Sequence, residues 1–144
     1  MKIRETTCSE LASSTGSTRP SWLESACDLL EKLPDYPCSR LLVAEEDRHP
    51  RAVLGLQLHW GVDGRLLRTV ICILAVDPTH GNRGIGSRLV RFAEGIARIH
   101  GCTRVDVAPG LERWCKGRCW TGLGYDDPGA GLHKVLESPV HRSA

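Results

Sequence analysis

The sequence predicts an α+β fold in which an antiparallel hairpin leads into the middle of a sheet. Residues 54–60 alternate between apolar and other side chains, as in a strand with one buried face. The favoured turn Asp63-Gly64 follows, and then an almost wholly apolar run over 66–76 that is typical of a strand covered on both faces. A glycine-rich turn and an amphipathic segment after this run predict a helix that packs on the sheet.

Length and composition are those of one globular domain spanning residues 1–144. The 19 basic and 17 acidic residues nearly balance, which argues against a nucleic-acid binder. No apolar run approaches the roughly 20 residues of a membrane span, and the first ten residues lack the apolar core of a secretory signal. We therefore expect a cytoplasmic protein with no membrane partner.

The elements before the hairpin are less regular. Lys2–Thr6 is a candidate first strand, and residues 9–33 are helical in pattern, broken by Gly16 and Pro20. Ser21, with Glu24 three residues later, is the expected N-cap of a helix that ends before Pro34. A short apolar run at 41–44 predicts the next strand.

After the glycine turn, the spacing predicts a helix of about 15 residues closed by Gly101. An alternating strand at 103–107, a helix at 111–123 and a short strand at 132–136 follow. The apolar face of the first of these helices is expected to hold Ile85, Leu89, Phe92, Ala93, Ile96 and Ile99.

The seven cysteines do not predict a metal site. Their odd number rules out complete pairing within the chain, and a chain without an export signal is expected to keep thiols reduced. Cys115 and Cys119 share one face of a predicted helix, but two further ligands at zinc-finger spacing are missing. We expect packing or incidental roles for the thiols.

The glycine turn is the most informative segment for function. Glycines at 81, 84 and 86 lie between a central strand and a helix, where main-chain N–H groups can converge on an anion. The helix N-terminus adds unpaired donors and a partial positive charge. No acidic residue occurs between Pro78 and Ala93, whereas positions 83, 88 and 91 are all arginine. This pattern favours a polyphosphate ligand.

Three other interpretations of the turn fit less well. A P-loop requires Lys-Ser/Thr where Ser87-Arg88 stands, and a dinucleotide fingerprint requires a third glycine where Leu89 stands. A plain strand-to-helix connection would need neither three glycines nor an acid-free flank.

The segment from Val76 to Val90 resembles the acyl-CoA loop of the GNAT acetyltransferase superfamily. Val76-Asp77-Pro78 matches the end of the family's central strand, and Gly84-Ile85-Gly86 matches the core of its loop. Trp120 to Tyr125 resembles the later F/Y-x-x-x-G-F/Y segment, and residues 133–136 resemble the last strand. Gly81 departs from the family, which usually has Arg or Gln there.

The resemblance implies a mixed, mostly antiparallel sheet with a splayed central strand pair, and acetyl-CoA or another acyl-CoA as cosubstrate. It implies transfer to an amine of a small molecule or a protein, with main-chain groups stabilising the oxyanion. It also allows a homodimer, since dimers are common in the superfamily. The residues that it places against the cosubstrate are Leu74, Ala75 and Val76 for the pantetheine arm, and Gly81, Asn82, Arg83, Gly84, Ile85, Gly86 and Ser87 for the pyrophosphate.

Acid and base residues are harder to assign, because Val70 occupies the position of the glutamate base that some relatives use. Candidate bases are His80 and Glu46, with His59 and Glu45 as alternatives. Trp120 occupies the usual place of the tyrosine acid, which leaves Tyr125, Cys119 or water. These departures keep open a non-catalytic acyl-CoA-binding module of the same fold.

Overall fold

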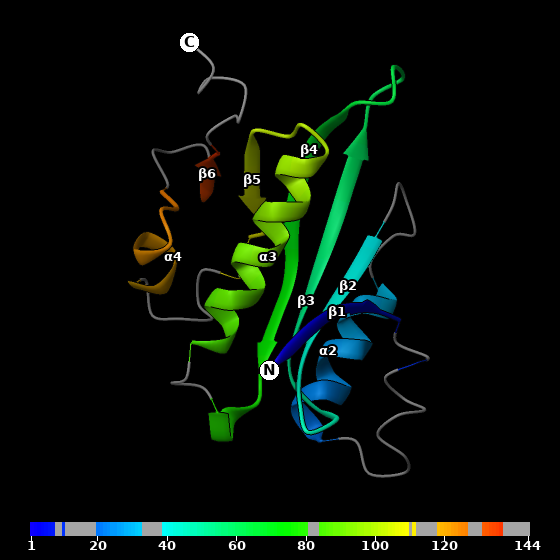
Figure 1. The fold of residues 1–144 in the computed structure, drawn as a ribbon, viewed down its shortest axis with the longest axis vertical. Helices are drawn as coiled ribbons and strands as arrows, with labels where there is room; N and C mark the ends of the chain where they lie inside the picture. Colours follow the sequence, from blue (N-terminus) through cyan, green and yellow to red (C-terminus); the bar gives the residue numbers. More distant parts are fainter. Residues whose placement is uncertain are drawn as a thin grey trace.

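A computed structural model describes residues 1–7, 10, 20–32, 39–80, 84–109, 111, 118–126 and 131–136. Within these residues the strands form one six-stranded sheet in sequence order, β1 to β6 (Figure 1). Every neighbouring pair is antiparallel except β4 and β5, which run parallel. The strands are β1 (Lys2–Thr6), β2 (Ser39–Glu46), β3 (His49–Trp60), β4 (Leu66–Val76), β5 (Arg104–Val107) and β6 (His133–Val135).

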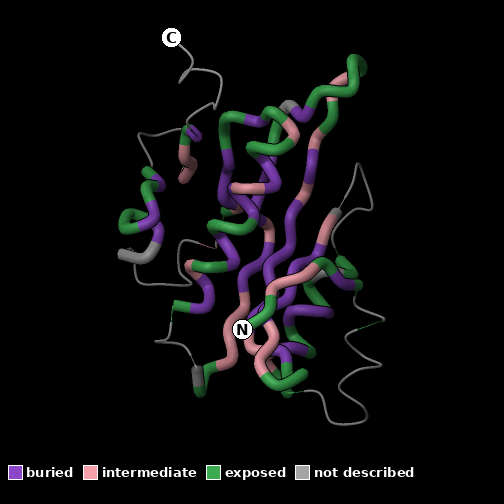
Figure 2. Tube along the Cα trace, in the orientation of Figure 1, coloured by how far each residue is buried: buried purple, intermediate pink, exposed green. Residues whose placement is uncertain are grey.

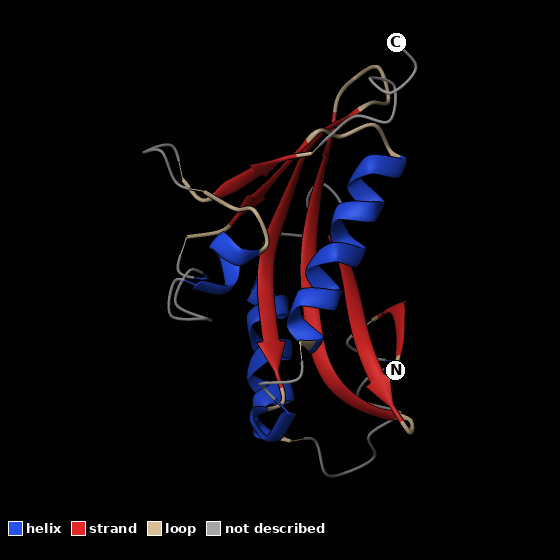
Figure 3. Ribbon diagram, turned by 60° about the vertical axis from the view of Figure 1, so that its left-hand side comes forward, coloured by secondary structure: helices blue, strands red, loops and turns tan. Residues whose placement is uncertain are grey.

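Helices cover both faces of the sheet, as Figure 3 shows. Side chains of α2 pack with Val43, Val53 and Ile73 on one face, whereas those of α3 join a larger cluster on the other. The helices are α2 (Ser21–Lys32), the 3-10 turn η1 (Pro78–His80), α3 (Ile85–Ile99) and α4 (Arg118–Gly122). Among the described residues, no helix combines the length and the apolar character needed to cross a membrane.

The predicted α+β class, with its mixed and mostly antiparallel sheet, is confirmed. Strand β4 has the predicted bounds, and the turn before it contains Gly64 at a φ of 83°. Gly61 donates to the carbonyl of Arg65 across that turn at 2.7 Å. Strands β2 and β3 are longer than the predicted runs because their polar ends also join the ladder, closed by Asp47 and Arg48 at positive φ.

The predicted N-cap of α2 is wrong by one residue. The carbonyl of Pro20 accepts from the N–H groups of Leu23 at 3.1 Å and Glu24 at 3.0 Å. Ser21 is therefore the first residue of the helix, and Pro20 occupies the capping position.

Helix α3 has the predicted length, but part of its predicted apolar face is wrong. Phe92 is 41% exposed and Ile99 is 81% exposed, whereas Val90 and Ala97 are buried. At about 100° per residue, Phe92 and Ile99 lie beyond the edge of the stripe that contacts the sheet. Two large apolar side chains of α3 thus face outward.

The larger core cluster encloses a charged group that was not among the predicted core residues. Glu94 of α3 is 2% exposed, and its Oε2 accepts a 2.9 Å hydrogen bond from the hydroxyl of Tyr125. The Nζ of Lys134 lies 3.1 Å from Oε1 of Glu94 and donates to the carbonyl of Leu123 at 2.7 Å. Figure 2 shows burial concentrated where the sheet meets α3. This triad (Glu94, Tyr125 and Lys134) ties α3 to β6 and to the segment after α4.

Candidate functional site

Strand β4 has partners on both edges for only part of its length. Its register with β5 covers Thr69, Val70 and Ile71, and the N–H of Ala108 then donates to the carbonyl of Ile71 at 2.9 Å. Its register with β3 continues to Val76. Figure 3 shows the short strands β5 and β6 diverging from β4. We call residues 69–71 the paired segment of β4 and residues 72–76 the open segment.

The main-chain groups of Leu74 and Val76 face the edge that β5 has left. The N–H of Asp77 donates to the carbonyl of Arg51 on β3 at 2.7 Å, so residue 77 points toward β3. Successive residues of a strand point their main-chain groups to opposite edges. Ala75 therefore bonds within the β3 ladder. Leu74 and Val76 instead present their N–H and C=O groups to the space between the diverging strands β4 and β5, which we call the gap. Within the described chain, no main-chain partner is found for these two on that edge.

A β-bulge separates the two segments of β4. Gly55 pairs with Ile73 and Leu56 pairs with Ile71, which leaves Cys72 as the extra residue. A bulge increases the local twist and bends the strand. Its position, directly after the last residue paired with β5, explains why the two central strands diverge there.

The paired segment is held by charged side chains as well as by its ladder. Asp106 of β5 accepts from the Nε of Arg68 and from the Nε of Arg104, both at 2.8 Å. Burial alone would raise the pKa of the Asp106 carboxyl, but the hydrogen bonds and charges of the two arginines lower it below its ordinary value. This cluster fixes β5 against β4 at the closed end of the gap.

At the other end of the gap, a short anchored loop leads from β4 to α3. The Oδ1 of Asp77 accepts from the main-chain N–H of Thr79 at 3.0 Å and from its hydroxyl at 2.8 Å. The Oδ2 of Asp77 lies 3.4 Å from Nη1 of Arg51, whose Nε is 3.9 Å from Oε1 of Glu46. These contacts fix where the chain leaves the sheet before η1.

The N-terminus of α3 has no side-chain cap. Gly84 occupies the N-cap position at a φ of 72°, in the left-handed region that glycine tolerates best, and it makes no capping hydrogen bond. The first turn contains no acidic residue, and only from Arg88 onward does an N–H reach back to the carbonyl of Gly84. Among the described residues no partner is found for the N–H groups of Ile85, Gly86 and Ser87, which can therefore bind an anion. The rest of the predicted turn, Gly81, Asn82 and Arg83, lies outside the described residues.

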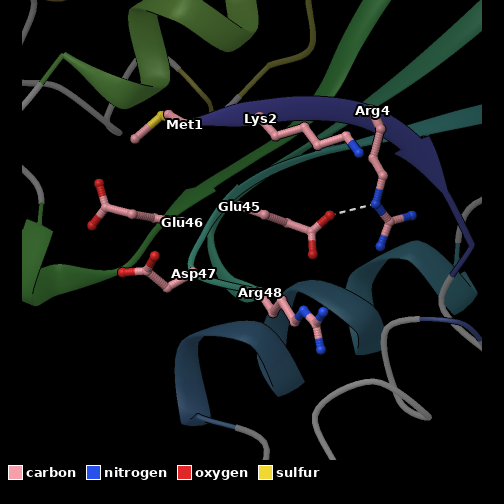
Figure 4. Close-up of a pocket in the computed structure, with 7 residues that line it drawn as sticks. All are labelled: Met1, Lys2, Arg4, Glu45, Glu46, Asp47 and Arg48. Carbon is pink, nitrogen blue, oxygen red and sulfur yellow. Dashed lines mark hydrogen bonds and ion pairs between the residues drawn. The ribbon is translucent and has the colours of Figure 1, made fainter.

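Glu46, a predicted base, lies at the far end of β2 from the bulge. It pairs with His49 beside the hairpin turn, and β3 separates its strand from β4. Two strand spacings place it on the order of 10 Å from β4. Its side chain lines a polar pocket of about 520 Å³ with residues of β1 and the turn, where Glu45 binds Arg4 (Figure 4). This position favours an ion-pairing role for Glu46.

Of the other two predicted catalytic residues, Tyr125 is held inside the core and His80 is the last residue of η1. Tyr125 is 1% exposed and donates to Glu94 inside the core. Burial, and then the neighbouring carboxylate of Glu94, raise the pKa of the Tyr125 hydroxyl far above its ordinary value. These features favour packing over proton donation. His80 ends η1, on the α3 side of the gap.

Sequence reasoning did not find Arg51, Asp106, Glu94 or Lys134. Each acts through a partner that is distant in sequence, such as Lys134 and Glu94 at a separation of 40 residues. A charged residue within an apolar stripe, as at position 94, was the one available signal.

Comparisons with known proteins agree with this architecture. A sequence model of the acetyltransferase (GNAT) family matches residues 7–113. The PaiA N-acetyltransferase of Thermoplasma acidophilum, solved in complex with coenzyme A, is similar to this chain with a TM-score of 0.64 at 13% identity, over 94% of this chain and 98% of that one. An aminoglycoside 6'-N-acetyltransferase of Acinetobacter haemolyticus gives 0.58 at 22% identity, over 88% and 91%. No curated protein sequence matches.

A transcriptional regulator of Bacillus halodurans is also similar, with a TM-score of 0.61 at 21% identity over 91% of this chain and 96% of that one. Likeness at such identities shows the fold alone. The family match covers most of the chain, from residue 7 just after β1 through β5, and includes the gap in the sheet and the glycine turn. The chain belongs to the GNAT family of acetyltransferases.

Proposed function

We propose that this chain is an N-acetyltransferase that transfers an acetyl group from acetyl-CoA to an amine of a small molecule or a protein, by direct attack and in the cytoplasm. The observation that carries the proposal is that two sets of main-chain groups have no partner among the described residues. One set is on the open segment of β4, and the other is at the N-terminus of α3.

These two sets match the two polar parts of coenzyme A. The pyrophosphate would bind residues 81–87, where N–H groups, the positive end of the α3 dipole and an acid-free first turn favour a dianion. The pantetheine amides would then run along the open segment and bond to Val76 as an added strand would. Ala75 would contact the pantetheine arm without hydrogen-bonding to it, because the main-chain groups of Ala75 bond to β3.

The thioester would lie near Leu74, farther from the pyrophosphate and closer to the point where β5 separates. We assign to the N–H of Leu74 the role of stabilising the oxyanion of the tetrahedral intermediate. The amine nitrogen attacks the thioester carbon, the C–S bond breaks, and CoA leaves as a thiolate. Proximity and this preorganised donor would supply most of the rate.

Two protons must leave the substrate nitrogen, one from the ammonium before attack and one after the C–N bond forms, and the leaving thiolate takes up one proton. Neither Glu46, two strands away, nor the buried Tyr125 lies beside Leu74. We therefore propose that water carries these protons, with His80 as the side chain to test. Replacement of His80 by alanine should leave the pH dependence of kcat unchanged if water serves, and should alter it if the imidazole is the base.

The binding claim is tested by titrating the protein with CoA and acetyl-CoA and measuring Tm. Saturable stabilisation is expected, since a ligand that binds only the folded state raises Tm. Gly84→Val should weaken binding by about tenfold or more, because a β-branched residue resists positive φ and displaces the helix N-terminus. Gly64→Val is the matched control: its φ is 83°, its added Cβ also meets open space, and it lies at the tip of the β3–β4 hairpin. Equal CoA affinity in both variants would refute the placement of the pyrophosphate.

A second candidate, a non-catalytic acyl-CoA-binding module, is favoured by one observation. Trp120 occupies the usual position of the acid and is buried, with its Nε1 donating to the carbonyl of Leu111 at 3.1 Å. Release of free CoA thiol from acetyl-CoA across a panel of amines separates the two candidates. An amine-dependent rate above the rate without protein supports the enzyme, and saturable binding without such a rate supports the module.

A further inference from the structure

The outward face of α3 combines positive charge with exposed apolar surface. Its exposed charged side chains are all arginines, at positions 88, 91 and 98, while Glu94, its one acid, is buried. Phe92 and Ile99 lie along one border of the same face, next to Arg88, whereas Arg91 and Arg98 lie farther round the helix. Trp60, which is 36% exposed, meets His100 edge to face at a centroid distance of 5.1 Å and adds an exposed aromatic ring near the C-terminal end of the helix.

The outward face of α2 has the opposite charge. Glu24, Asp28 and Glu31 are exposed at a spacing of four and three residues, which places them along one border. Leu29, which is 54% exposed, lies on the other border, and Lys32 ends the helix. Within the part of the chain that the structure describes, these three acids, and Arg88 and Arg91 on α3, have no ion-pair partner.

The two faces cannot meet within one molecule, because α2 and α3 pack on opposite faces of the sheet. We propose that they meet between molecules: the outward face of α3 is a docking surface for α2 of a second copy of this chain. The arginines would face the acids, and Leu29 would contact Phe92.

The order of the borders also sets the orientation of the two helices. Viewed from its N-terminus, each helix turns about 100° clockwise per residue. On both helices the charged border comes before the apolar border in this clockwise direction. When both helices have this order, charged border faces charged border and apolar border faces apolar border only if the helices run antiparallel. The contact uses different surfaces on the two molecules, so it is heterologous and leaves one free face at each end. Its strength should fall with salt, since exposed charges contribute to it.

The experiment is sedimentation analysis of the full chain without CoA, over a concentration series reaching the high micromolar range. At low salt the average mass should rise with concentration, and in roughly 1 M salt, where the Debye length is about 3 Å, it should return toward that of the monomer. Arg88→Glu/Arg91→Glu, which makes the α3 face acidic, and Glu24→Lys/Asp28→Lys, which makes the α2 face basic, should each weaken self-association by about tenfold or more.

A mixture of these two variants should associate again, because the acidic α3 of one faces the basic α2 of the other. The control is Lys2→Glu/Arg48→Glu, which changes the net charge as much as the α3 variant does but at exposed residues off both helices, and it should associate as the wild type does. Circular dichroism confirms that each variant is folded. A wild type that stays monomeric at low salt, charge reversals without effect, or a mixture that stays monomeric would each overturn the proposal.

Discussion

The two segments of β4 are held and lined in different ways. The paired segment is fixed by side chains, with Arg68 and Arg104 on Asp106, and beyond β5 the buried triad fastens β6 to α3. The open segment presents main-chain groups at Leu74 and Val76, and its loop is anchored from the side by Arg51 and Asp77. Side chains thus fix the two ends of the gap, while the main chain lines it.

Under the proposed function, this difference would let the chain keep its cosubstrate site while side chains along the strand change. Main-chain donors depend on register and twist, which the bulge at Cys72 sets, and not on the identity of the residues that carry them. Relatives at 13% to 22% identity therefore share the fold with this chain. The side-chain contacts of Asp106 and of the triad do depend on residue identity. We therefore expect these residues to be more sensitive to substitution than Leu74 and Val76.

Loss of the buried cation should give the largest effect on stability. Lys134→Met leaves the Glu94 carboxylate buried beside Tyr125 with one partner fewer, and breaking such a pair typically costs about 3–5 kcal/mol. Urea unfolding measures the change. Lys2→Met, at an exposed residue of β1, is the control and should have almost no effect. A cost for Lys134→Met as small as that of the control would show that the triad is not an anchor.

Proline substitution separates the two edges of β4 at neighbouring residues. Ala75→Pro removes an N–H that faces β3 and should cost about 3 kcal/mol or more of stability. Val76→Pro removes an N–H that faces the gap, so it should cost less stability but lower CoA affinity about tenfold. Urea unfolding and a CoA titration are measured on both variants. If the two prolines behave alike, the assignment of edges is wrong.

Neutralising Asp106 should loosen the paired segment by a smaller amount. Its two arginine partners are about half exposed, so Asp106→Asn should cost about 1 kcal/mol. Because the pKa of Asp106 is lowered on folding, the unfolded state binds more protons as pH falls below 3.8, and stability is lost in that direction. Stability measured against pH should show a weaker acid dependence in Asp106→Asn than in the wild type, and equal slopes would contradict this.

Cys72, the extra residue of the bulge, should have a small effect on stability at alkaline pH. Burial raises the pKa of the Cys72 thiol from 9.0 to about 11, outweighing a hydrogen bond from the Gln57 main chain and the charge of Arg68. Between these two pH values the unfolded state loses the proton first, so stability should fall as pH rises. Cys72→Ala should lose this part of the alkaline dependence, and alkylation of Cys72 in the folded wild type should be slow at neutral pH.

Local patterns determined much of this protein. The apolar run at 66–76, Asp63-Gly64 and the glycines before Ile85 set strand β4, its hairpin and the start of α3, because strand period, turn chemistry and helix N-termini depend on residues close in sequence. The same patterns identified the family and the residues proposed to hold the cosubstrate.

Only the tertiary structure decided which groups are left without partners and which charges are buried. Phe92 and Ile99 fit a helical apolar face but point outward, since the sheet covers a stripe narrower than the pattern. Tyr125 could be a catalytic acid by its place in the sequence, yet a glutamate 31 residues away holds its hydroxyl inside the core. The gap beside Leu74 exists because β5 leaves β4 at a bulge, and such pairing depends on contacts between distant segments that no local pattern encodes.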